Sequence, residues 1–170
     1  GRPVRLIGLS QDITDRKLAE QALRRSEVKY RTLFESIDEG FCVIELIFDE
    51  KDRPIDYRFL EVNPAFAKHT GLEQALGRRV REMIPNQENF WFEVYGRVAR
   101  TREAARFQSP TAALNRFFDV YAFPTGEPDQ ARVAVLFSDI TEHKRAEETL
   151  RQSNVTLEAK VAERTAELEH

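Results

Sequence analysis

The sequence "VLFSDITEHKRAEETLRQS" (residues 135–153) has a near copy at the other end of the chain. The copy, "GLSQDITDRKLAEQALRRS", covers residues 8–26, and ten of the nineteen aligned positions are identical. In both, a short apolar run ends at Asp-Ile-Thr, and a segment of good helix formers follows. We expect Thr14 and Thr141 to cap these helices with their hydroxyls. Two copies at one fixed offset predict a single domain bracketed by two connectors.

The composition limits the class of protein. The 170 residues are 41% hydrophobic and 32% charged, with a formal net charge of −3, which is typical of a soluble domain with long exposed helices. This balance argues against a nucleic-acid partner. Cys42 is the only cysteine, so no internal disulfide can form and a reducing, cytoplasmic location is expected. The longest apolar run is too short to span a bilayer, so we expect no direct membrane contact.

The central part alternates between strand and helix patterns. Asn63-Pro64 is typical of a helix start, and Gly71 of a helix end. Val4–Leu9 reads as the end of a strand. Five later segments read as strands, and helices lie between the second and the third of them. This order predicts an α+β fold with an antiparallel sheet covered on one face. The five expected strands are residues 41–48, 55–62, 104–108, 116–123 and 132–138.

Several phrases in this order resemble the PAS domain of bacterial sensor proteins, chiefly of the histidine kinase type. They are "FESIDEGFCVIEL" (34–46), "FLEVNPAFAKHTGL" (59–72), "GRRVREMIP" (77–85), "YGRVARTREAARF" (95–107), "FFDVYAFP" (117–124) and "VAVLFSDITEHKRAEE" (133–148). The resemblance implies a five-stranded antiparallel sheet with short helices on one face, plus N- and C-terminal extension helices.

The resemblance also divides the chain. Residues 1–14 look like the tail of a preceding PAS domain, 15–27 like a connector helix, 28–141 like a complete PAS domain, and 142–170 like a signalling or coiled-coil helix. The last residue, His170, is typical of the start of a purification tag.

The function that the resemblance implies is a sensor or relay module of a multidomain protein, most simply a sensor histidine kinase. Asp139, Ile140 and Thr141 would pass the signal to a dimeric signalling helix, which leads to a kinase or other output domain in the same chain. Two alternatives stay open. The module could be a ligand-free dimerisation spacer, or it could be attached to a diguanylate cyclase.

The residues themselves indicate neither catalysis nor a resident cofactor. The sequence lacks a nucleophile elbow, a phosphate-binding loop and a paired-cysteine motif, so this chain is expected not to be an enzyme. Compared with flavin- and haem-binding PAS domains, it has no cysteine in residues 77–84 and no histidine in residues 89–101. Cys42 reads as a small buried hydrophobe and His69 as a helix-end histidine without metal partners.

The sequence is compatible with a pocket for an unidentified small ligand and also with a core filled by aromatic side chains. The polar and aromatic side chains that would line such a pocket are Glu45, Tyr57, Trp91, Tyr95, Arg106 and Tyr121.

The C-terminal segment carries an apolar stripe at heptad spacing. Such a stripe predicts a homodimer through the terminal helices, and a single Asn in the seam favours a parallel pair. The seam residues are Leu150, Asn154, Leu157, Val161 and Leu168. Arg164 also falls in the seam and weakens the pairing there.

Overall fold

The computed structural model describes residues 4–169, with side chains from residue 10 onward. Its elements are α1 (Val4–Ser36), β1 (Gly40–Phe48), β2 (Pro54–Val62), α2 (Pro64–Thr70), α3 (Val80–Met83), α4 (Asn89–Thr101), β3 (Ala105–Thr111), β4 (Arg116–Thr125), a 3-10 turn (Pro128–Gln130), β5 (Arg132–Asp139) and α5 (Thr141–Leu168). Two compact units divide between Asp38 and Glu39, so that α1 belongs to the first unit and the later elements to the second.

The five strands form one antiparallel sheet in the order β2-β1-β5-β4-β3. The first strand of the domain therefore pairs with its last strand at the centre of the sheet, with Gly40 opposite Phe137. A side chain at Gly40 would collide with the Phe137 ring, since an added Cβ would lie 2.5 Å from it. The single five-stranded antiparallel sheet, together with its helices, confirms the predicted α+β class and the antiparallel PAS-type sheet.

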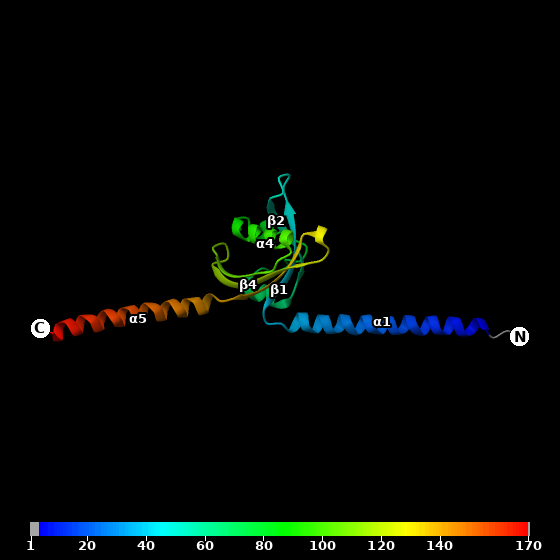
Figure 1. The fold of residues 1–170 in the computed structure, drawn as a ribbon, viewed down its shortest axis with the longest axis horizontal. Helices are drawn as coiled ribbons and strands as arrows, with labels where there is room; N and C mark the ends of the chain where they lie inside the picture. The colour runs from blue at the N-terminus through cyan, green and yellow to red at the C-terminus, as the bar shows by residue number, and fades with distance from the viewer. Residues whose placement is uncertain (1–3, 170) are drawn as a thin grey trace. The chain divides into compact units, whose positions relative to one another are not determined.

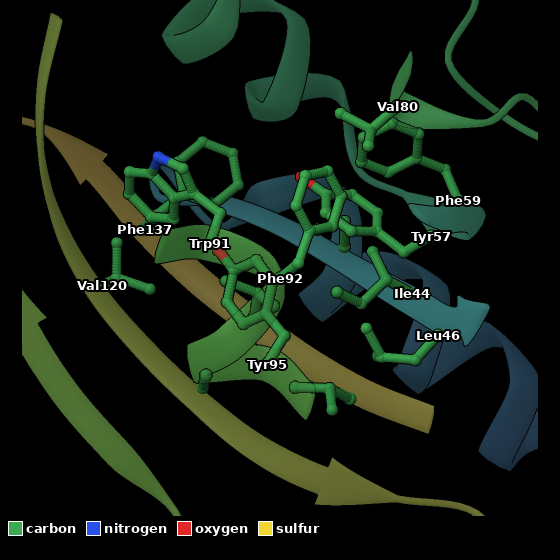
Figure 2. Packing of buried hydrophobic residues seen from close by; sticks show 14 of the residues in the cluster. Ile44, Leu46, Tyr57, Phe59, Val80, Trp91, Phe92, Tyr95, Val120 and Phe137 are labelled. Atoms are coloured by element: carbon green, nitrogen blue, oxygen red, sulfur yellow. The ribbon is translucent and has the colours of Figure 1, made fainter. Parts of the chain in front are cut away.

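The core lies between the sheet and the helices α2, α3 and α4, which contact one of its faces (Figure 1). Strand residues alternate between the two faces because successive side chains point in opposite directions. Ile44, Val120 and Val133 are fully buried on the covered face. Figure 2 shows Trp91, Phe92 and Tyr95 of α4 packed among these strand residues. Aromatic rings supply much of the buried volume.

The helix α2 begins and ends as its sequence predicts. The Asn63 side chain accepts a hydrogen bond from the Phe66 backbone N–H at 3.0 Å, and Pro64 occupies the first turn. Gly71 closes the helix with φ at +75°, a conformation that glycine adopts without strain.

The predicted strand at Val4–Leu9 is wrong, because α1 is continuous from Val4 to Ser36. The predicted cap at Thr14 is wrong for the same reason: Thr14 lies inside the helix, and its hydroxyl donates to the Ser10 carbonyl. A strand forms only where another strand offers backbone partners, and within residues 4–169 the five strands pair with one another. The helix-forming residues downstream then extend the helix through this segment. The assignment of residues 1–14 to a preceding domain stays a prediction, and residues 1–3 lie outside the described part.

The C-terminal helix α5 follows β5 directly and has no buried residue. Within residues 4–169, no helix is long and apolar enough to cross a membrane.

Candidate functional site

A cavity of about 60 Å³ lies in the core between the inner face of the sheet and the helices. The segment before α4 and the first turns of that helix form one wall, through Gln87, Trp91 and Tyr95. Phe66 and Thr70 of α2 form another, and the strands contribute Cys42 and Phe137 among others. The cavity is therefore bounded by elements from most of the domain.

Two polar atoms in the cavity wall have no hydrogen-bond partner. They are the Gln87 side-chain oxygen Oε1 and the Trp91 indole nitrogen Nε1. Both side chains are deeply buried, with 8% of Gln87 and 4% of Trp91 exposed. Buried polar atoms in folded proteins nearly always have a partner, so this pair marks the cavity as unusual.

The hydroxyls of Tyr57 and Tyr95 keep their protons. Burial raises the pKa of both phenols far above the ordinary range. Burial likewise raises the pKa of the Cys42 thiol, which leaves it protonated and unreactive. The wall of the cavity is uncharged.

Three of the six predicted pocket residues line this cavity, namely Tyr57, Trp91 and Tyr95. The other three lie on the opposite face of the sheet and do not line this cavity. Glu45 alternates with the inward Ile44 and Leu46, and its carboxylate lies 3.4 Å from Arg132.

Arg106 and Tyr121 are opposite each other on β3 and β4, also on the outer face. Arg106 pairs with Asp119 at 3.4 Å, and 42% of Tyr121 is exposed. The two-residue period of each strand accounts for the outward direction of all three side chains, because their neighbours in sequence are the more buried ones.

The predicted relay residues form a hydrogen-bonded junction where β5 becomes α5. The Asp139 carboxylate accepts from the Thr141 backbone N–H at 2.9 Å and also from the Thr141 hydroxyl. The Thr141 hydroxyl in turn accepts from the Phe117 N–H at 2.9 Å, and the Ile140 N–H donates to the Phe117 carbonyl at 2.8 Å. The junction is thus fastened to the start of β4.

The prediction that Thr141 caps α5 is wrong. The residue in the N-cap position is Ile140, which makes no side-chain capping bond, and Thr141 is the first helical residue. Asp139 performs the capping task instead, since its carboxylate takes the free Thr141 N–H at the start of the helix. The hydroxyl of Thr141 is used for the tie to β4.

His69 and Arg116, neither of which the sequence assigned to the relay, connect this junction to α2. The Asp139 backbone N–H donates to the His69 ring nitrogen Nδ1 at 3.1 Å. Arg116 forms an ion pair with the Asp139 carboxylate at 3.4 Å and donates to the His69 carbonyl at the end of α2. His69 is a helix-end residue as predicted, but its contact with Asp139 spans 70 residues of sequence.

The environment of Asp139 favours its charged form. Partial burial acts to raise its pKa, but the hydrogen bonds from Thr141 and the charge of Arg116 outweigh this effect. The pKa of Asp139 is therefore held below its ordinary value.

The predicted seam residues all lie on the exposed surface of α5. Within the described residues, no group of three or more His, Cys, Asp or Glu side chains could hold a metal ion.

Comparison with known proteins bears on the central part of the chain. A sequence profile of the family described as PAS domain matches residues 28–104. No curated protein matches the sequence.

Among solved structures, the PAS domain of an HTR-like protein from Haloarcula marismortui matches 73% of this chain and 99% of its own, with 18% identity and a TM-score of 0.50. An RNA-binding light-oxygen-voltage receptor matches 82% of this chain and 39% of its own, with 15% identity and a TM-score of 0.52. A sensory box sensor histidine kinase from Vibrio cholerae matches 72% of this chain and 98% of its own, with 14% identity and a TM-score of 0.46. At their identities, the first two of these structures show a shared fold with this chain.

Proposed function

We propose that this chain is a cytoplasmic sensor or relay module of a multidomain bacterial sensor histidine kinase, on the basis of the match of residues 28–104 to the PAS-domain profile. The repeated Asp-Ile-Thr connectors and the exposed helix α5 support this placement. In this role the chain performs no catalytic step of its own. It changes the activity of an output domain that follows it.

The observation that carries the proposal is the continuous path from the cavity wall to the first turn of α5. Thr70 lines the cavity on α2, and the neighbouring His69 holds the backbone of Asp139. Asp139 then holds the backbone of Thr141 at the start of α5. A displacement of α2 or β5 would therefore act on the start of the outgoing helix.

Transmission of this kind requires two arrangements whose balance the signal changes. In one arrangement the Thr141 hydroxyl fastens α5 to β4 by accepting from the Phe117 N–H, and Asp139 holds the Thr141 N–H, as observed here. In the other, a change at the cavity moves α2, weakens the His69 contact and frees the first turn of α5. Paired in a homodimer along the Leu150, Leu157 and Val161 stripe, two such helices would shift together and change the output.

The experiment is a pair of isosteric substitutions in α5 of the parent protein. Thr141→Val removes the hydroxyl that ties the junction to β4. Thr149→Val is the matched control, since the Thr149 hydroxyl bonds only the Arg145 carbonyl within the same helix. We expect Thr141→Val to change the basal output activity severalfold while Thr149→Val keeps the wild-type level. Equal output from both folded variants would refute the relay.

A ligand-free spacer is the competing function, and the small cavity volume favours it. A spacer would hold the output domains together without altering them. In that case, deleting residues 150–168 should abolish output through loss of the dimer, and Thr141→Val should have no effect on it.

A further inference from the structure

The two unpartnered atoms in the cavity wall are chemically complementary. Gln87 Oε1 can only accept a hydrogen bond, and Trp91 Nε1 can only donate one. The two side chains come from one short segment, four residues apart, and both residues line the same cavity. One group that donates and accepts at the same time would therefore satisfy both atoms. Leaving both unpaired is unfavourable, because a buried polar group without a partner has lost its bonds to water.

We propose that this cavity binds a small uncharged molecule through one group that both donates and accepts, such as a primary amide or a hydroxyl, held between Gln87 and Trp91. The proposal deepens the sensor function by naming the class of ligand, and it rests on that function for its biological meaning. Binding itself does not depend on the relay.

The lining excludes a charged ligand. None of the residues around the cavity is Asp, Glu, Lys, Arg or His. The nearby hydroxyls of Tyr57 and Tyr95 stay protonated, because burial holds the pKa of each above the ordinary range. A carboxylate or an ammonium group would lose its hydration here without gaining a counter-ion.

The volume excludes a large ligand in the observed arrangement. About 60 Å³ is available, whereas a cavity needs about 10–15 Å³ of this kind of space to hold one water molecule and pockets for larger ligands measure about 300–1,000 Å³. The space therefore suits a molecule, or the polar end of one, with only a few non-hydrogen atoms. The remaining surface is aromatic and aliphatic, including Phe59, Phe66 and Val135, and suits an apolar methyl or methylene group.

The test uses Trp91 as its own reporter. It is the only tryptophan in the chain, so its indole N–H gives a single tryptophan resonance in a nitrogen-15 NMR spectrum. Three probes of the same size differ only in their polar groups: acetamide donates and accepts, acetone only accepts, and acetate is an anion. We expect acetamide to shift the indole resonance saturably and to bind about fivefold more tightly than acetone. Acetate should leave the resonance in place.

Two substitutions locate the contact. Gln87→Met removes the amide while keeping a similar length, and should lower acetamide affinity to that of acetone. Gln108→Met is the matched control, because Gln108 is exposed on β3 and does not line the cavity. If Gln87→Met does not fold, the acetamide and acetone titrations of the wild-type chain still decide the question.

Three results would overturn the proposal. The first is an indole resonance that exchanges magnetisation with water but ignores all three probes, which would mean that the cavity holds water only. The second is equal affinity for acetamide and acetone in the wild-type chain. The third is unchanged acetamide binding in a folded Gln87→Met variant. None of these depends on output activity, so a failure of the relay between Asp139 and α5 would be seen separately.

Discussion

Asn63 shows how a single buried amide can fix three segments at once. Its oxygen accepts from the N–H groups of Phe66 and Phe41, at 3.0 and 2.8 Å, and its NH2 group donates to the Glu39 carbonyl at 2.9 Å. It therefore caps α2 and also holds the start of β1. The side chain is buried, so water cannot replace these bonds if they are lost.

We expect Asn63→Ala to lower the free energy of unfolding by about 2–3 kcal/mol, since it removes a helix cap and leaves buried backbone groups unpaired. Urea denaturation followed by circular dichroism measures this value. Asn86→Ala, in an exposed turn, is the control and should change it by less than about 0.5 kcal/mol. A similar loss in both variants would show that the Asn63 bonds do not stabilise the domain.

The lowered pKa of Asp139 predicts that the stability of the domain depends on pH. Its pKa is lower in the folded chain than its ordinary value of 3.8, so the unfolded chain takes up a proton first as the pH falls. The stability that the carboxylate contributes is complete above the unfolded pKa and is lost as the pH falls through the folded pKa.

The measurement is the free energy of unfolding of wild type and Asp139→Asn between pH 7 and pH 3. The wild-type advantage over Asp139→Asn should be constant near neutral pH and should shrink below about pH 4. A difference that does not change with pH would mean that the Asp139 charge contributes nothing to stability.

For single residues, the sequence predicted which polar side chains matter, but it did not predict their hydrogen-bond and ion-pair partners. Asp139 and Thr141 were recognised from their repeated motif, but their roles as cap and tie depend on Phe117, Arg116 and His69. Those partners are distant in sequence, and no periodic pattern brings them together. Gln87 carries no local signal either, because its importance comes from the cavity opposite it.

At the scale of elements, α5 exposes apolar residues that a single chain leaves in water. Leu150, Leu157 and Val161 are each more than half exposed. Their heptad spacing favours pairing with a second copy of the helix. We expect Leu157→Lys to weaken the dimer at least about tenfold, because a charged group would enter the seam. Sedimentation equilibrium of the purified chain measures the dissociation constant.

The matched control for this variant is Thr156→Lys, one residue away and on the outer side of the same helix. It adds the same side chain without entering the seam and should leave the dissociation constant within about twofold. If both variants dimerise as the wild type does, the main interface lies outside α5.

Local patterns predicted most elements within one or two residues, and α4 and the start of α2 at their observed bounds. These elements carry their own signals: caps, turn residues and an alternating apolar pattern. The failure at Val4–Leu9 has a different origin, because an isolated apolar run fits a strand or a helix and is decided by its neighbours. Ile55 is a smaller case. Its place in the alternating pattern of β2 predicts an inward side chain, yet 41% of Ile55 is exposed.

At the scale of the whole molecule, we expect the purified chain to be colourless. The cavity is far smaller than the pockets of about 300–1,000 Å³ that hold large ligands, and no histidine lines it. Its one thiol, Cys42, is buried and protonated. An absorption spectrum of the folded protein checks this, with the protein band as the internal standard for stoichiometry. A flavin or haem band of one equivalent per chain would contradict it.

The pairing of β1 with β5 has a mechanical consequence. The two strands run antiparallel, with the first residue of β1, Gly40, opposite Phe137 near the end of β5. A tension applied through the chain on either side of the domain would therefore pull two adjacent strand ends apart. The hydrogen bonds between these strands would then break one after another, as a zipper opens, instead of resisting together in shear. Such a domain yields to a weaker pull at its ends than one whose end strands are loaded in shear.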